Sequence, residues 1–181
     1  MKTLLMKKKW IIFVALLCIA IVVSHVIIDS QKKKEYEEKY SEAFIDLFVT
    51  ERNEVLRLYE AIGKVIEIPS DRNYEDAYAI ACETENTCKT KYAKMTNLKG
   101  IIIYAQSYYS TFYRDVKAVL STKTDATELQ DVYGLFGKII SLYDKHSNPM
   151  TARDKIEEMN QFFTSLMALN EEMNLINRIL Q

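Results

Sequence analysis

Nineteen residues near the start of the chain, Trp10 to Ile28, form an apolar run that only Ser24 and His25 interrupt. About 20 apolar residues in a helix span the roughly 30 Å hydrocarbon core of a bilayer. Lysines flank the run on both sides, at positions 7–9 and 32–34, and Trp10 stands where the headgroup region is expected. The sequence therefore predicts a transmembrane anchor over residues 10–28.

Two other fates of this segment were weighed against an uncleaved anchor. Cleavage after Ser24 is compatible with the residues before it, but apolar residues 26–28 carry the run past that point and favour the anchor. Lipid attachment at Cys18 is disfavoured because Leu17 precedes it and the apolar run continues behind it. His25 lies close enough to the end of the run to reach the interface as a neutral imidazole, so no function is assigned to it.

Charge is distributed unevenly along the chain. Residues 1–34 carry a formal charge of +6, whereas residues 35–181 carry −7. Basic residues beside an apolar run attract lipid headgroups, while an acidic remainder is repelled by nucleic acid. A tail of nine residues with four lysines is readily retained inside the cell. We therefore expect a short basic cytoplasmic tail over residues 1–9, the anchor in the cell membrane, and an extracytoplasmic domain over residues 29–181 that does not bind nucleic acid.

Glycine and proline are scarce, with 4 and 2 copies, which disfavours turn-rich β folds. We expect an all-α chain in which the transmembrane helix is followed by an antiparallel bundle of four long helices and one short one. The expected helices cover about residues 31–68, a short stretch after Pro69 and Ser70, about 91–120, a stretch from Asp125, and a last helix from Asn148 and Pro149.

Apolar residues three and four positions apart mark the core face of each long helix. The four sets are Tyr40, Phe44, Leu47, Val55, Leu58, Ile62 and Val65; Met95, Leu98, Ile102, Ala105, Tyr109, Phe112, Val116 and Val119; Leu129, Val132, Phe136, Ile139 and Tyr143; and Phe162, Leu166, Leu169, Met173, Ile176 and Leu180. Short loops between them favour a bundle over one extended coiled coil, with self-association through a spare stripe as an alternative.

Residues 82–90 are polar and show no apolar period, so a loop is expected there. Cys82 and Cys88 flank it and are the only cysteines beyond the apolar run. In an oxidising extracytoplasmic space such a pair is a disulfide candidate, whereas two free thiols would be expected in the cytoplasm. A zinc site is not indicated, because neither a histidine nor a second cysteine pair lies nearby.

Tyrosine is abundant, with 12 copies, and four of them cluster at positions 104–113 of the third expected helix. Tyr109 belongs to the core stripe, which leaves Tyr104, Tyr108 and Tyr113 as candidates for an aromatic contact surface. The alternative is a central helix that packs on two sides and buries these rings, and we favour it.

The sequence contains no GxSxG, SxxK, HExxH, P-loop or GxGxxG pattern. We therefore assign no catalytic, cofactor-binding or metal-binding residue and do not expect an enzyme. His146, the only histidine beyond the apolar run, is expected in a loop near the end of a helix.

These features favour a membrane-anchored helical interaction module that contacts another envelope or surface protein. Exclusion or immunity factors and accessory subunits of envelope machines have this layout. The alternative is a ligand-binding helical sensor that signals through a partner subunit, since a tail of nine residues holds no effector.

Overall fold

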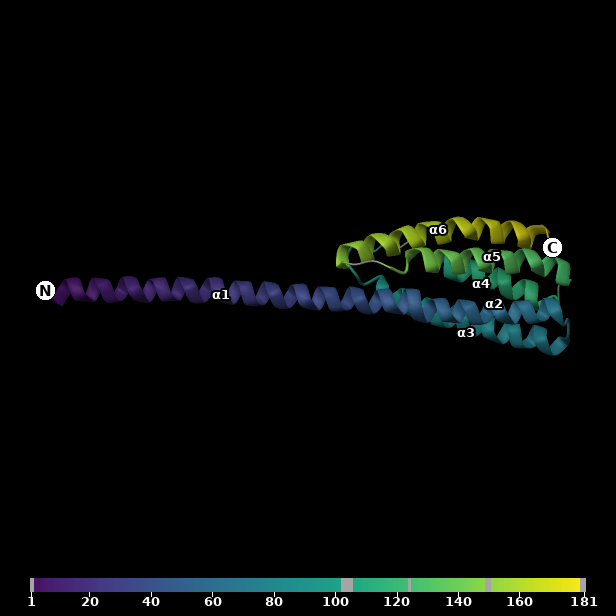
Figure 1. The fold of residues 1–181 in the computed structure, drawn as a ribbon, viewed down its shortest axis with the longest axis horizontal. Helices are drawn as coiled ribbons and strands as arrows, with labels where there is room; N and C mark the ends of the chain where they lie inside the picture. Colours follow the sequence, from purple (N-terminus) through teal and green to yellow (C-terminus); the bar gives the residue numbers. More distant parts are fainter. Residues whose placement is uncertain (1, 102–105, 124, 149–150, 180–181) are drawn as a thin grey trace. The chain divides into compact units, whose positions relative to one another are not determined.

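A computed structural model describes the backbone of residues 2–101, 106–123, 125–148 and 151–179. Within these ranges, the side chains of residues 2–9, 11–15, 106–107, 126–128, 152 and 174–179 are not described. The chain divides into two units, Met1–Lys39 and Tyr40–Gln181 (Figure 1). The described residues form helices and turns, and they contain no strand, as the sequence predicted.

Helix α1, Lys2–Ile45, supplies the whole of the first unit. It is continuous where the sequence offered no helix breaker, between Ile28 and Tyr36. Among the helices as far as their residues are described, none is long and apolar enough to cross a membrane. The expected span, residues 10–28, includes residues 11–15, whose side chains lie outside the description.

The second unit begins in the last turns of α1 and continues through a π-helix, η1 (Asp46–Glu51), into α2 (Arg52–Glu67). These three elements together correspond to the expected first long helix, and every predicted core residue of that helix is buried. The helix ends before Pro69, as predicted. The Ser70 hydroxyl then caps the next helix by accepting a hydrogen bond of 3.3 Å from the Asn73 amide.

The prediction of a loop at residues 82–90 is wrong, because helix α3 (Asp71–Met95) runs through that segment without a break. Its buried positions recur three or four residues apart, but Thr84, Glu85 and Cys88 occupy three of them. Small or ion-paired side chains fill the core face there, so a pattern of apolar residues alone could not reveal the helix. The expected short helix is therefore the first half of a helix of 25 residues.

The chain turns instead after α3, at residues 96–100, within the stretch predicted to be the third long helix. Gly100 has a positive φ of 94°, a conformation that side chains with a Cβ atom rarely adopt. Helix α4 (Gln106–Ser121) follows, then α5 (Ala126–His146) and α6 (Ala152–Ile179). Thr151 and Asp154 cap α6 reciprocally, so that helix begins later than Asn148 and Pro149 suggested.

Five helices, α2 to α6, make up the bundle in the described part of the second unit, and successive helices run antiparallel (Figure 1). Each contacts two others along its length, in the cyclic order α2, α3, α4, α6, α5. Aromatic rings fill much of the centre. Phe48 and Tyr143 pack against Phe162, and Phe112 packs edge-on against Phe136.

Candidate functional site

Glu51, the last residue of η1, is fully buried within the bundle. The same segment also buries Leu47 and Phe48, so three of the six side chains of the π-helix point into the core. π-helices are rare and frequently occur at functional sites. A buried carboxyl group at such a segment is the strongest chemical anomaly in the described structure.

Two tyrosine hydroxyls bind this carboxyl group, and both donate to the same oxygen. Tyr109 of α4 and Tyr143 of α5 each lie 2.6 Å from Glu51 Oε1. Glu51 Oε2 is equally buried but has no hydrogen-bond partner among the described residues. Buried polar atoms are nearly always paired, so this asymmetry requires an explanation.

Burial raises the pKa of Glu51 from 4.5 to about 7. The hydrogen bonds from Tyr109 and Tyr143 act in the opposite direction, because they stabilise the anion, and the nearby Asp46 carboxylate adds to the rise. Near neutral pH the group therefore exists in both protonation states. Few other carboxyl groups in a protein core can exchange a proton in this range.

The buried thiol and tyrosine hydroxyls around Glu51 remain neutral over the same range. These side chains are Cys88, Tyr108, Tyr109, Tyr113 and Tyr143. Burial is the main cause that raises the pKa of each of the five well above its ordinary value. A thiol of this kind is a poor nucleophile, because the thiolate is the reactive form. The site can therefore bind and release one proton, on Glu51, while Tyr109 and Tyr143 hold the carboxyl group in position.

The described residues contain no group of three or more histidine, cysteine, aspartate or glutamate side chains placed to hold a metal ion.

The chain matches no protein-family model, no curated protein and no solved structure. Its function is therefore inferred from its own residues.

The disulfide expected between Cys82 and Cys88 is not formed, and both thiols are free. The reason is geometric. Six residues of α-helix separate the two Cα atoms by about 9 Å along the axis, whereas a disulfide requires less than about 7 Å. Once α3 is continuous, the two residues cannot be bridged without unwinding it.

Two of the three candidates for an aromatic contact surface lie in the core. Tyr108 and Tyr113 are buried, so neither ring is available to a partner. Tyr104 lies outside the described residues. The burial follows from the position of α4, which packs on both α3 and α6 and so presents apolar area on more than one face. The alternative that we favoured from the sequence, a central helix packed on two sides, fits the two described rings.

Sequence reasoning missed Glu51, although a signal was present. The apolar stripe of the first long helix jumps eight positions from Leu47 to Val55, and Glu51 stands halfway between them. A carboxylate at a core position of an otherwise regular stripe is itself a candidate site, because charged residues are almost never fully buried without a partner.

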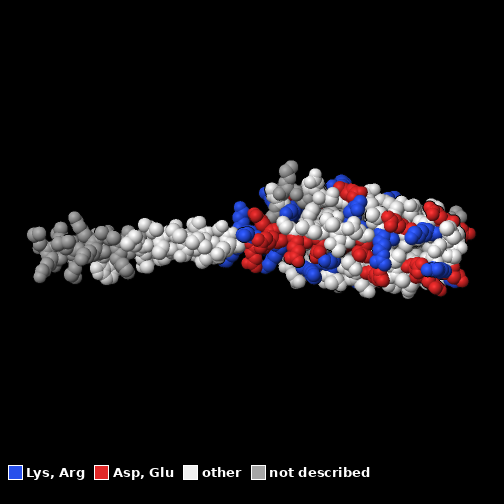
Figure 2. Space-filling model, turned by 60° about the horizontal axis from the view of Figure 1, so that its bottom comes forward, with Lys and Arg blue, Asp and Glu red and all other residues white. Residues whose placement is uncertain are grey.

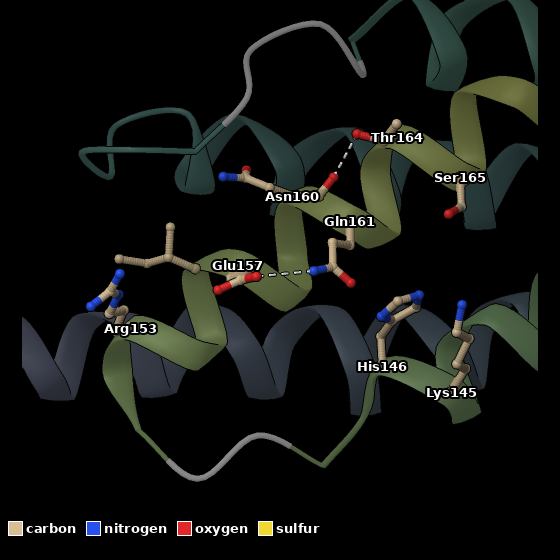
Figure 3. A pocket seen from close by; sticks show the side chains of 9 residues that line it. Lys145, His146, Arg153, Glu157, Asn160, Gln161, Thr164 and Ser165 are labelled. Carbon is tan, nitrogen blue, oxygen red and sulfur yellow. Dashed lines mark hydrogen bonds between the residues drawn. The ribbon is translucent and has the colours of Figure 1, made fainter.

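A second polar site lies where the end of α5 meets the first half of α6 (Figure 3). This hollow has a volume of about 670 Å³, and most of its lining comes from one face of α6. Lys145 and His146 point towards α6 from the end of α5, and Arg153 lies near the start of α6 (Figure 3). Gln161 donates a hydrogen bond of 3.2 Å to Glu157 in the hollow.

His146 is the last residue of α5 and is buried, whereas the sequence suggested a loop position. Its Nδ1 lies 2.5 Å from a carboxylate oxygen of Glu158. The Nε2 atom is buried and has no partner among the described residues. If Nδ1 donates to Glu158, Nε2 retains a lone pair that can accept a hydrogen bond.

Proposed function

We propose that this chain is a helical interaction module that α1 anchors in a cell membrane, and that its bundle acts by contact with another envelope or surface protein. One observation carries the anchoring: α1 exposes large apolar side chains on every side over almost four turns. They are Leu16, Leu17, Ile19, Ile21, Val22, Val23, Val26, Ile27 and Ile28.

A helix that is apolar all round belongs in a protein core or in lipid. The described structure covers none of these nine side chains with protein, which leaves lipid as the medium that would bury them. Figure 2 shows this part of α1 as a stretch without charged side chains. Exposed lysines at positions 32–34 follow it, where they would meet lipid headgroups.

Contact with a partner is supported by a small apolar patch on the bundle. Ile45 and Val49 lie four positions apart and are 55% and 52% exposed. Exposed apolar residues that lie together on a surface are typical of protein contact sites. A contact surface of this kind requires no catalytic group, which agrees with the expectation of an interaction module.

Carbonate extraction of membranes tests the anchor. We expect the full chain to remain in the membrane pellet and the double variant I19D/V22D to be released, because each aspartate near the centre of a span costs about 2.5 to 3.5 kcal/mol. The matched control, I45D/V49D, changes exposed apolar residues outside the expected span and should remain in the pellet. Release of the unmodified chain would refute the anchor.

Topology is tested with a reporter fused after Gln181 that is active only outside the cytoplasm. We expect activity, because the basic tail is retained inside. If this fusion is inactive and a reporter that works only in the cytoplasm is active in its place, the bundle lies inside the cell. That result would contradict the proposed orientation but not the anchor.

The partner contact is tested with a photoreactive residue at position 45 or 49 in living cells. We expect a discrete adduct with another membrane or surface protein from these positions and none from position 60, which is exposed but polar. The same adducts from all three positions, or none from any, would contradict a specific contact through this patch.

The hollow between α5 and α6 favours a second candidate function, a ligand-binding sensor. Neither Lys145 nor Arg153 is paired with an acidic side chain among the described residues, and the buried Nε2 of His146, which also lines the hollow, has no hydrogen-bond partner there. A small hydroxyl-bearing organic anion would suit such a lining. We would test citrate against chloride at equal ionic strength. Stabilisation of the chain that R153Q abolishes would favour the sensor, and its absence would favour the interaction module.

A further inference from the structure

The hydrogen bonds of Glu51 match a neutral carboxylic acid better than a carboxylate. The carbonyl oxygen of an acid has two lone pairs, and the hydroxyls of Tyr109 and Tyr143 fill both on Oε1. A carboxylate would need donors on both oxygens, yet Oε2 has none among the described residues. The O–H of the acid also lacks an acceptor there, but an unpaired hydroxyl costs less to bury than an unpaired charge. An ionised group in this position would therefore be buried with half of its charge unsolvated.

The surroundings offer an anion of Glu51 no compensating positive charge. The groups that act on its pKa are two tyrosines and the Asp46 carboxylate of η1, and none is a cation. Lys91 of α3 is bound to Asp46 at 2.5 Å, and Lys89 of the same helix is paired with Glu85.

The remaining neighbours are acids or apolar groups. They are Glu54 of α2, Cys88 of α3, Tyr108 and Tyr113 of α4, and the ring of Phe162 of α6, which packs against Phe48. The pair of His146 and Glu158 lies on the far side of the Phe162 ring. Ionisation of Glu51 therefore has to be relieved by a change in structure, namely the entry of water or the withdrawal of η1.

We propose that Glu51 is a proton-operated latch: its protonated form lets η1 stay packed against α4 and α5, where Tyr109 and Tyr143 bind it, and loss of the proton loosens this segment as the pH rises, because the buried anion has no counter-charge. The proposal does not depend on the anchoring of α1. The latch would give η1 a role in regulating partner contact, because η1 also carries Val49, one of the two exposed residues of the apolar patch.

The direction follows from linkage. A carboxyl group that holds its proton more tightly in the closed form favours that form most at low pH. The advantage declines as the pH rises from 4.5, the ordinary value, towards about 7, and is lost above that. If opening exposes Glu51 to water, the opening equilibrium constant should increase about 70-fold between about pH 5 and pH 8.

Hydrogen exchange of the full chain in detergent measures this opening. The amide of Arg52 is the probe, because it donates to the Leu47 carbonyl across the π-helical turn. After correction for the intrinsic exchange rate, we expect the pH dependence above in the natural chain and in E60Q, which changes an exposed glutamate of α2. The glutamine in E51Q has nearly the same shape as glutamate but cannot ionise. In this variant the opening equilibrium constant should vary less than about threefold over the same pH range.

Infrared spectroscopy supplies a readout that does not depend on opening. The natural chain should show the band of a protonated carboxylic acid near pH 6 that is lost by about pH 9 and is missing from E51Q. Equal pH dependence of opening in the natural chain and E51Q would overturn the latch. The absence of a protonated acid assignable to Glu51 near pH 6 would overturn it as well.

Discussion

Glu51 and Glu85 are both buried carboxyl groups, yet their environments shift their pKa values in opposite directions. Burial acts to raise the pKa of Glu85, but hydrogen bonds from Lys117 and Lys89 outweigh it, and the pKa is lowered. Both lysines lie 2.5 Å from its oxygens. Glu85 is thus a charged link between α3 and α4, whereas Glu51 has only hydroxyl donors. The partner, more than the depth of burial, decides the protonation state.

Replacement of Tyr143 by phenylalanine should raise the pKa of Glu51 further. Its hydroxyl stabilises the anion, so its removal favours the protonated acid. The carboxyl carbon shift of Glu51 followed by NMR across the pH range would report the midpoint. A midpoint that moves down in Y143F would contradict the hydrogen-bond assignment.

Glycines 63 and 134 form a matched pair for testing close packing between α2 and α5. A Cβ atom on Gly134 meets nothing within 4 Å, so G134A should raise the free energy of unfolding by up to about 1 kcal/mol through helix propensity. On Gly63 the same atom would lie 3.2 Å from the Tyr133 ring, which stacks on Tyr59 at 4.1 Å. We expect G63A to be about 1 kcal/mol less stable than G134A in urea denaturation. Equal stability would mean that the stacked rings give way freely.

The two thiols of α3 should differ sharply in reactivity. Cys88 is fully buried, and burial raises its pKa well above the ordinary value, whereas Cys82 is half-buried. A maleimide should modify Cys82 of the folded chain and reach Cys88 only after unfolding. Reducing agent should leave the unfolding temperature unchanged, and a fall on reduction would instead indicate a disulfide.

At the scale of elements, α3 and α4 show where periodic patterns fail. Helix α3 was predicted as a short helix and a loop, because polar residues replace apolar ones on its core face. The true break after Met95 was overlooked, since apolar residues continue through it at helical spacing. The chain turns there because Gly100 adopts a positive φ, and Asn160 of α6 donates a hydrogen bond of 2.8 Å to its carbonyl.

Replacement of Gly100 by alanine tests that turn. The added Cβ atom would meet Ile156 at an ordinary distance of 3.6 Å, so the cost is expected from the backbone conformation alone. We expect G100A to lower the free energy of unfolding by about 1 to 2 kcal/mol. Unchanged stability would show that the turn relaxes to a conformation open to all residues.

At the scale of the whole molecule, the sequence predicted an all-helical chain and most of its core. Every predicted core residue of α5 is buried, as are Tyr109, Phe112 and Val116 of α4. The positions of Ile102, Ala105, Ile176 and Leu180 lie outside the described side chains. The candidate site could not be predicted in the same way. Three elements bring Glu51, Tyr109 and Tyr143 together over separations of 58 and 92 residues, and no local pattern encodes such a meeting.

The described core residues all follow Lys39, which has a consequence for truncation. A fragment of residues 35–181 should fold with the helical content of the bundle and unfold at the same urea concentration as the full chain. Circular dichroism and urea titration would check this. A markedly lower midpoint would show that residues before position 35 contribute to the stability of the bundle.

The π-helical turn also makes the position of a deletion decisive. A π-helix contains one residue more than the α-helical turn it replaces, so deletion of a single residue from η1 would let α1 run into α2 as one regular helix. Each residue of an α-helix corresponds to a rotation of about 100°. The deletion in η1 would therefore leave Tyr40 and Phe44 facing the core, whereas a deletion in the regular part of α2 would turn both residues away from it by about that angle.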